Sequence, residues 1–269
     1  SYISVATTNA TGIMPNNDYD RYNFSFRNTT NFLNNKFILD TSANYIIQND
    51  KNMVSQGQYF NPLTSLYLFP RGEDFSDVAV YERYDDLSGV NTQYWPYGDL
   101  GGVSSQNPYW IMNRMNREND RRRYKLAASL QYNIIEGLNV QGRVSIDNTE
   151  SKYTEKFHAG TVGNFAGPKG RYKEENRLDR QVYADVLANF NKTFNEFNVT
   201  ANLGASIKDL RMELTSLHGD LNNVTNHFTI ENLTRSGYYK VNADGLKRQT
   251  QSVFANAEIG WRSFLYLSL

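Results

Sequence analysis

Side chains that could carry out covalent chemistry are few in this sequence and poorly spaced for it. The absence of Cys excludes disulfides, thiolate metal sites and cysteine nucleophiles. The three histidines, His158, His218 and His227, lack the spacing of a metal site, and we interpret them as solvated residues of external loops. The acidic residues that come closest to a calcium loop or a glycosidase pair lack the required pattern: Asp74, Asp77, Asp85 and Asp86. We therefore expect no catalytic residues, no metal site and no cofactor.

Aromatic residues give a stronger functional signal. The segment 50–121 contains the clusters Trp95-Pro96-Tyr97 and Pro108-Tyr109-Trp110, which combine a stiff backbone with flat apolar rings. Such rings can stack on sugars or bury peptide side chains at an external site. The alternative is that they pack a long loop against itself or against a partner protein. The candidate contacts with a ligand or a partner are Tyr94, Trp95, Tyr97, Tyr109 and Trp110. We expect Trp95 to be exposed and Trp110 to be structural.

Charge and hydropathy set limits on the class of protein. The chain carries 28 basic and 28 acidic residues, so its formal net charge of zero gives no electrostatic reason to expect nucleic-acid binding. Apolar residues make up only 39% of the chain, and no apolar run approaches the ~18 residues of a membrane-spanning helix. No signal peptide opens the sequence. Hydropathy alone would therefore indicate a soluble protein, but the periodicity indicates otherwise.

Apolar residues recur at every second position, which is the period of a β-strand. The segments with this pattern are 2–7, 22–32, 37–47, 124–134, 138–146, 182–190, 197–207, 253–261 and 264–269. The apolar set of each long segment contains no charged residue, whereas the alternate set contains Arg27, Asp40, Arg143 and Asp185. The sequence therefore predicts long strands with one apolar and one polar face. Asn28 is the exception on its apolar face, where we expect a bulge or a hydrogen bond.

Three features favour lipid over a soluble protein core on the apolar face. The strands run about 9–11 residues, the span of a tilted membrane strand, whereas soluble strands are typically ~5–6 residues long. Short turns alternate with three long segments that we expect to be external loops, 50–123, 148–180 and 208–250, which is the layout of an outer-membrane barrel. Aromatic residues gather beside the short turns and predict one interfacial girdle: Phe32, Phe37, Tyr132, Phe194, Phe197, Trp261 and Phe264.

Counting the segments predicts a nine-stranded, all-β, antiparallel sheet that cannot close on itself. A single-chain up-and-down barrel in bacteria has an even number of strands, because its last strand pairs antiparallel with its first. We therefore expect residues 1–269 to be an internal piece of a larger transmembrane barrel. The run Arg121-Arg122-Arg123 would then lie at the top of a strand, near lipopolysaccharide headgroups or loop carboxylates.

Several segments, in the same order along the chain, resemble one protein family. Asn-Pro-Tyr-Trp at 107–110 precedes a basic strand start at 121–124, and 12–18 and 252–267 are also similar to family segments. The chain thus resembles the SusC/RagA family of TonB-linked nutrient transporters of the Bacteroidetes outer membrane. The resemblance implies a plugged barrel of the 22-stranded class. Of that barrel, the TonB box, the plug and the C-terminal strands are absent from this sequence.

The resemblance also implies a function. It implies a Gram-negative outer-membrane importer of oligosaccharides or oligopeptides, capped by a SusD-like lipoprotein lid and driven by TonB through parts not in this chain. Membrane lipid and lipopolysaccharide would surround it, with no covalent chemistry and no nucleic acid. The alternative is a soluble, surface-attached carbohydrate-binding β-sheet protein, which detergent dependence would distinguish. A glycosidase that uses loop carboxylates ranks third.

Overall fold

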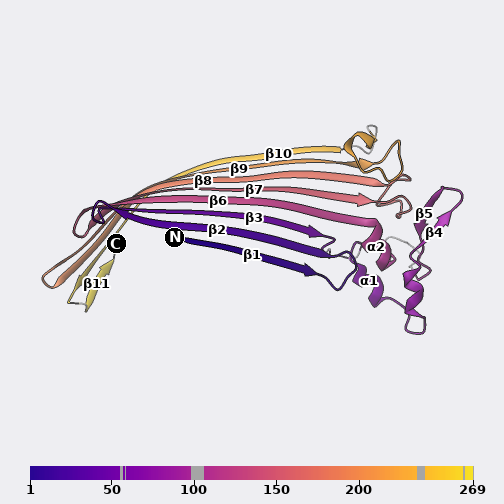
Figure 1. Cartoon of the computed structure of the whole chain (residues 1–269), viewed down its shortest axis with the longest axis horizontal. Coiled ribbons are helices and arrows are strands. Elements are labelled where there is room, and N and C mark those ends of the chain that lie inside the picture. The colour runs from indigo at the N-terminus through magenta and orange to yellow at the C-terminus, as the bar shows by residue number, and fades with distance from the viewer. Residues whose placement is uncertain (55–56, 58, 98–105, 235–239, 263, 269) are drawn as a thin grey trace.

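One long antiparallel sheet contains most of the chain in the computed structural model, which describes residues 1–54, 57, 59–97, 106–234, 240–262 and 264–268 (Figure 1). Its strands lie side by side in sequence order, and a separate two-stranded hairpin lies in the long loop between β3 and β6. This confirms the expected sheet of nine strands. Their bounds are β1 Tyr2–Thr11, β2 Asp18–Phe32, β3 Phe37–Lys51, β6 Met115–Ile135, β7 Leu138–Phe157, β8 Arg171–Phe194, β9 Phe197–Asp220, β10 Lys240–Trp261 and β11 Leu265–Ser268.

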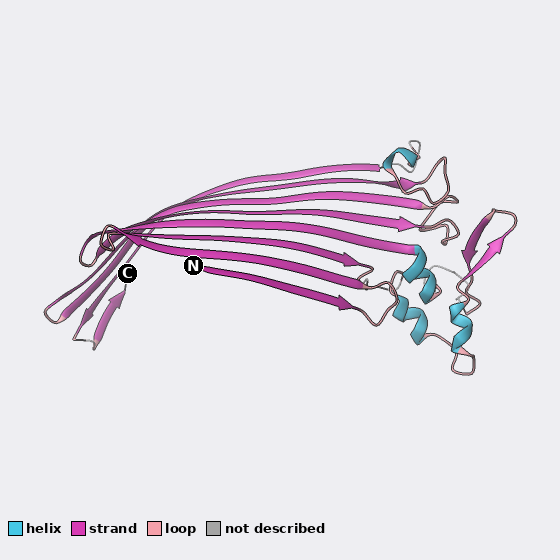
Figure 2. Ribbon diagram, in the orientation of Figure 1, coloured by secondary structure: helices cyan, strands magenta, loops and turns pink. Residues whose placement is uncertain are grey.

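The short helices gather at one end of the sheet, together with a separate hairpin, and short turns lie at the other end (Figure 2). The long loop after β3 folds into α1 (Pro62–Tyr67), the 3₁₀-helix η1 (Phe75–Ala79), the hairpin β4 (Glu82–Asp85) and β5 (Val90–Gln93), and α2 (Pro108–Arg114). A second 3₁₀-helix, η2 (Ile230–Asn232), lies between β9 and β10. No helix in the described ranges is long and apolar enough to cross a membrane.

The register keeps the two faces separate across the sheet. Phe26, Ala43 and Leu126 lie opposite one another on β2, β3 and β6, and the row continues through Ile146 and Val182. Because the period of a strand is two, this alignment places the polar residues of every strand together on the other face. The apolar face stays uncovered by any other described segment: Val186 is 49% exposed and Leu203 is 59% exposed. The predicted two-faced sheet is confirmed.

The strands are longer than the sequence predicted, so the expected external loops at 148–180 and 208–250 are wrong for most of their length. β8 and β9 each span 24 residues, and the described part of the second segment includes only a short loop around η2. Residues 235–239 of that prediction lie outside the described residues. His218 belongs to β9 rather than to a loop, whereas His227 lies in the loop before β10 and His158 directly follows β7.

Cross-strand ion pairs explain why the strands continue where the apolar alternation ends. Lys156 Nζ lies 2.9 Å from a carboxylate oxygen of Glu118, and Lys152 Nζ lies 3.2 Å from one of Glu174. With polar side chains on both faces, the backbone ladder extends into water without an apolar signature. Periodicity of hydrophobic residues detects only the part of a strand that meets an apolar environment.

Aromatic rings line the short-turn end, as predicted. Phe32 and Phe37 stack across their turn with ring centroids 5.3 Å apart, and Phe37 stacks on Tyr132 of the next strand at 4.7 Å. The turn itself needs three consecutive residues with positive φ, which Leu33, Asn34 and Asn35 provide. In the predicted turn at Arg262-Ser263, Ser263 lies outside the described residues, as does Leu269 at the end of the last predicted strand.

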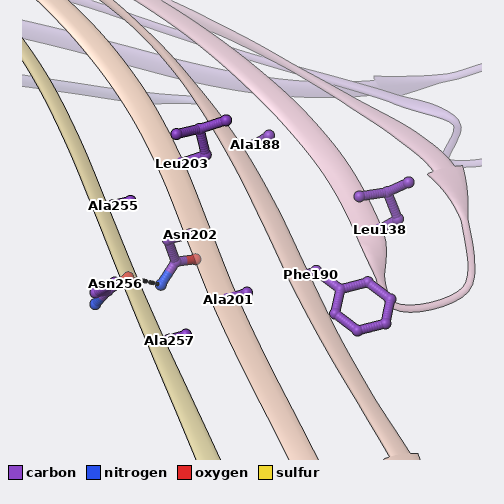
Figure 3. Close-up of a pocket in the computed structure, with 9 residues that line it drawn as sticks. All are labelled: Leu138, Ala188, Phe190, Ala201, Asn202, Leu203, Ala255, Asn256 and Ala257. Atoms are coloured by element: carbon purple, nitrogen blue, oxygen red, sulfur yellow. Dashed lines mark hydrogen bonds between the residues drawn. The ribbon is translucent and has the colours of Figure 1, made fainter. Parts of the chain in front are cut away.

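Two sequence features of the apolar face have a structural account. Asn28, the exception in its row, donates from Nδ2 to Thr30 Oγ1 at 2.8 Å and accepts from Ser1 Oγ at 3.1 Å, so the hydrogen bond expected there is present. Small residues on β8, β9 and β10 leave a shallow hollow of about 430 Å³ between larger neighbours (Figure 3). The residues around it are Leu138, Ala188, Phe190, Ala201, Asn202, Leu203, Ala255, Asn256 and Ala257.

Candidate functional site

Trp110 anchors the long loop to the end of the sheet. Asn107 caps α2, since its side-chain oxygen accepts from Tyr109 N at 2.8 Å, and the following Pro108 suits the first turn of a helix. The helix places the Trp110 ring in a buried cluster with Met115 and Phe157, where it is 0% exposed. Its indole Nε1 donates to Thr161 Oγ1 at 3.1 Å. The Asn-Pro-Tyr-Trp segment is therefore a helix start that packs the loop.

Buried carboxamides fix the rest of the loop to this anchor. The side-chain Nδ2 of Asn107 donates to the backbone oxygens of Val78 at 2.9 Å and Tyr94 at 3.1 Å. Gln106, equally buried, donates from Nε2 to Tyr59 O at 2.7 Å. Since an unpaired polar group is costly to bury, these bonds specify one loop conformation. Sequence reasoning named Asn107 only as part of the Asn-Pro-Tyr-Trp segment, without this role, and missed Gln106 directly before it.

The loop carries a partly exposed aromatic ridge, which we define as Phe69, Phe75, Trp95 and Tyr97. The Phe69 ring lies 4.9 Å from that of Tyr97 and 5.6 Å from that of Phe75, and Trp95 lies 5.4 Å from Tyr97, centroid to centroid. Trp95 is half-buried and Phe75 is 48% exposed, so the ridge presents apolar surface to the outside. Phe69 lies before η1 and Phe75 is the first residue of η1, and their spacing in the sequence gave no signal.

Acidic side chains surround the ridge. Burial raises the pKa of the Tyr97 hydroxyl above its ordinary value, and the nearby carboxylates of Glu73 and Asp77 raise it further. Asp74 lies in the same segment and caps η1 by accepting from Ser76 N at 2.9 Å. The ridge is therefore an apolar surface with a negative rim. Such a surface can bind a ligand or a protein.

The other predicted contact residues lie apart from the ridge. The guanidinium of Arg83 covers the Tyr94 ring at 3.3 Å, and Tyr109 stacks near Tyr81 with centroids 6.5 Å apart. Both tyrosines are half-buried. Trp110 is buried in the anchor, so its ring has no surface to offer a ligand, and its role is structural. The structure thus brings Trp95 and Tyr97 together, places Tyr94 beside them in the chain and separates Tyr109 and Trp110.

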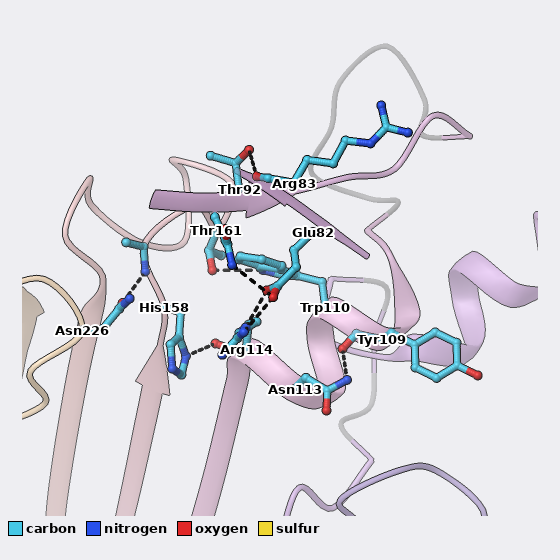
Figure 4. A network of polar contacts seen from close by, with 12 residues as sticks. Glu82, Arg83, Thr92, Tyr109, Trp110, Asn113, Arg114, His158, Thr161 and Asn226 are labelled. Atoms are coloured by element: carbon cyan, nitrogen blue, oxygen red, sulfur yellow. Dashed lines mark hydrogen bonds and ion pairs between the residues drawn. The ribbon is translucent and has the colours of Figure 1, made fainter. Parts of the chain in front are cut away.

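A polar network connects the hairpin β4–β5 to the sheet (Figure 4). Arg114 forms two hydrogen bonds of 2.8 Å with the carboxylate of Glu82. This pairing, the largest cause, lowers the pKa of Glu82. His158 Nδ1 lies 2.9 Å from Arg114 O, and burial lowers the pKa of the imidazole. Within the described ranges, no group of three or more His, Cys, Asp or Glu could hold a metal ion.

Solved structures with the same fold exist, whereas no protein-family model and no curated protein matches the sequence. The structure of the RagAB peptide importer in its open-open state aligns with 99% of this chain and 28% of its own, with a TM-score of 0.71 and 13% identity. The RagAB peptide transporter aligns with 94% of this chain and 27% of its own, with a TM-score of 0.68 and 12% identity.

A third structure extends the likeness beyond peptide import. The ferric-catecholate import receptor Fiu of E. coli K12, in its closed form, aligns with 96% of this chain and 34% of its own, with a TM-score of 0.50 and 11% identity. These neighbours are TonB-dependent outer-membrane transporters, and the chain spans about a third or less of their lengths. The fold is therefore that of a partial β-barrel of TonB-dependent receptors.

Proposed function

We propose that the chain forms part of the barrel wall of a TonB-dependent outer-membrane importer of oligosaccharides or oligopeptides. The whole of residues 1–269 then belongs to the barrel domain, and the plug and remaining strands come from other parts of the protein. The observation that carries the proposal is the nine-stranded sheet with one uncovered apolar face, whose path matches 99% of this chain to RagAB. Lipid covers such a face in a membrane barrel.

The external loops provide the second part of the proposal. A SusD-like lipoprotein lid closes over the loop end of the sheet, and the aromatic ridge contacts the lid or the trapped ligand. Support comes from Trp95 and Tyr97, two adjacent, half-buried rings on a loop that buried amides hold in place. Flat, partly exposed rings suit either sugar or protein contacts. The protein binds and moves its ligand without changing it.

Import of labelled ligand by cells tests this function directly. Cells that express the protein in their outer membrane should accumulate a fluorescent oligopeptide or oligosaccharide, and loss of TonB should abolish accumulation while leaving the protein in the membrane. Purified protein should require detergent to stay monodisperse. A protein that is monodisperse in buffer without detergent, and that binds sugar there, would instead support the soluble carbohydrate-binding alternative.

A further inference from the structure

A groove crosses β6, β7 and β8 on the polar face of the sheet, between the apolar band and the external loops. Its volume is about 590 Å³. By strand alternation its residues project to the same side as Arg143 and Asp185, which is the interior side in the barrel fold. The charged residues around it are Arg121, Arg123, Lys173, Glu175, Arg177 and Asp179. Cations thus outnumber carboxylates in a chain whose net charge is zero.

The carboxylates of this groove are already occupied by cations. Lys173 Nζ lies 3.0 Å from Glu175, and the Arg177 guanidinium donates to Asp179 at 2.7 Å. Arg123, in turn, is held by Asp147, which lies just outside the groove, at 2.6 Å. Each of these pairs neutralises itself. No carboxylate lining the groove therefore remains for the fourth cation.

Arg121 is that fourth cation. Its side chain is half-buried, and its guanidinium forms no hydrogen bond or ion pair with any residue in the described part of the chain. Directly opposite it stand the uncharged Gln48 and Ser151. The amide of Gln48 is turned away, because its Nε2 donates to Asp50 at 3.1 Å. A half-buried guanidinium with five unused donors is a strong recognition group for a carboxylate.

An aliphatic patch lies on the same face, beyond the groove. It consists of Leu210, Met212, Leu214 and Leu246 on β9 and β10. Leu214 lies in the same cross-strand row as Arg121, through Ser151 and Arg177. Three strand spacings separate them, roughly 14 Å, which equals about four residues of an extended peptide. Aliphatic side chains bury apolar peptide groups, whereas sugar recognition favours aromatic faces.

We infer that Arg121 binds a carboxylate of an oligopeptide ligand, and that the aliphatic patch holds an apolar side chain about four residues away. This rests on the proposed import function and deepens it by naming the ligand chemistry. The carboxylate comes either from an acidic side chain or from the C-terminus of the peptide. Both sources offer the planar, bidentate partner that an Arg guanidinium prefers.

Binding of three fluorescent heptapeptides to the detergent-solubilised membrane protein tests the inference. All three have Leu at the second position. The first has Glu at the sixth position and an amidated C-terminus, the second has Gln there and an amidated C-terminus, and the third has Gln there and a free C-terminus. The anisotropy titration should show that the first or the third binds more tightly than the neutral second, and the preferred one identifies the source of the carboxylate.

Substitution of Arg121 provides the decisive comparison. Arg121→Gln should weaken binding of the preferred anionic peptide about tenfold or more, because it removes a charge-assisted pair. The affinity for the neutral peptide should not change. Arg121→Lys should retain part of the preference. The matched control is Arg122→Gln, which changes the neighbouring residue on the opposite face of the same strand and should alter no peptide's affinity.

The other outcomes overturn the inference in distinguishable ways. If peptides bind without regard to charge, or if Arg121→Gln weakens all three equally, the carboxylate site is wrong while peptide import stands. If Arg121→Gln lowers only the yield of folded protein, Arg121 is a structural partner of another part of the barrel. If the protein binds and imports none of the peptides, both this inference and peptide import fail together.

Discussion

The two tryptophans of the long loop illustrate how similar residues acquire different roles. Trp95→Ala should weaken binding of ligand or lid several-fold and leave folding intact, since a stacked ring contributes roughly 0.5–1.5 kcal/mol beyond its buried area. Trp110→Ala should instead destabilise the loop by about 3–5 kcal/mol, because it leaves a cavity in a buried cluster. Binding titrations and hydrogen exchange measure the two effects. The control is Tyr84→Ala, at an exposed position in β4.

The contrary result for this pair is equally specific. If Trp95→Ala leaves ligand and lid affinity unchanged while hydrogen exchange in segment 69–97 accelerates, the ridge is internal packing. Co-purification of the lid separates the remaining two roles, since a ligand contact should not affect it. If Trp95→Ala weakens ligand binding while the lid still co-purifies, Trp95 contacts the ligand.

His158 predicts a pH dependence of the loop anchor. Burial lowers its pKa, and the charges of Arg114 and Lys156 act in the same direction. The hydrogen bond with the Arg114 backbone oxygen and the Glu82 carboxylate oppose them. The unfolded histidine therefore takes up a proton first as the pH falls below about 6.5. As the pH falls from that point to the folded pKa, the folded loop should lose stability. Above about pH 6.5, His158 should have no effect on the stability of the loop. Hydrogen exchange of segment 157–170, corrected for intrinsic rates, should rise at acidic pH, and His158→Gln should remove that dependence.

The ion pair between Glu82 and Arg114 tethers β4 to the end of α2. Glu82→Gln leaves the Arg114 guanidinium without its carboxylate in a partly buried site, where their side chains are 22% and 32% exposed. We expect the stability of the loop to fall by about 1–2 kcal/mol. This value lies between those for exposed ion pairs and for bidentate, partly buried ion pairs. Hydrogen exchange in β4 and β5 should accelerate while β6 stays protected. Asp86→Asn, an exposed neighbour, should change neither, and equal acceleration in both variants would refute the tether.

At this scale the sequence predicted some features and missed others for physical reasons. Strand order, the two faces and the aromatic girdle follow from side chains such as Phe37 and Tyr132, because lipid imposes a period that remains visible in the sequence. The strand extensions around Lys152 and Glu118 escaped prediction, since water on both faces imposes no such period. Only part of the ridge could be predicted from the sequence. Trp95 and Tyr97 are close in the sequence, but Phe69 contacts them only through the fold.

The whole sheet separates two environments by side-chain alternation alone. On one face, charged pairs such as Arg143 with Asp185, 2.6 Å apart, lie among carboxamides that bond across strands. On the other face, within the same strands, aliphatic and small residues carry no charge through the apolar band. A sheet of this kind is stable only if water meets the first face and lipid meets the second. Substitution to Arg should therefore be costly on the second face and tolerated on the first.

Arg placed on each face of β8 in the membrane-embedded protein therefore tests the architecture of the whole molecule. Val186→Arg should cost about 2–4 kcal/mol, the depth-dependent penalty for a guanidinium in mid-bilayer lipid, and Leu203→Arg on β9 should behave alike. Asn189→Arg should cost only the bond of about 1 kcal/mol from Asn189 Nδ2 to Asn139 Oδ1, which spans 2.8 Å. Denaturant unfolding in lipid vesicles measures all three variants. Similar costs on the two faces would mean water on both sides of the sheet, and no barrel wall could satisfy that result.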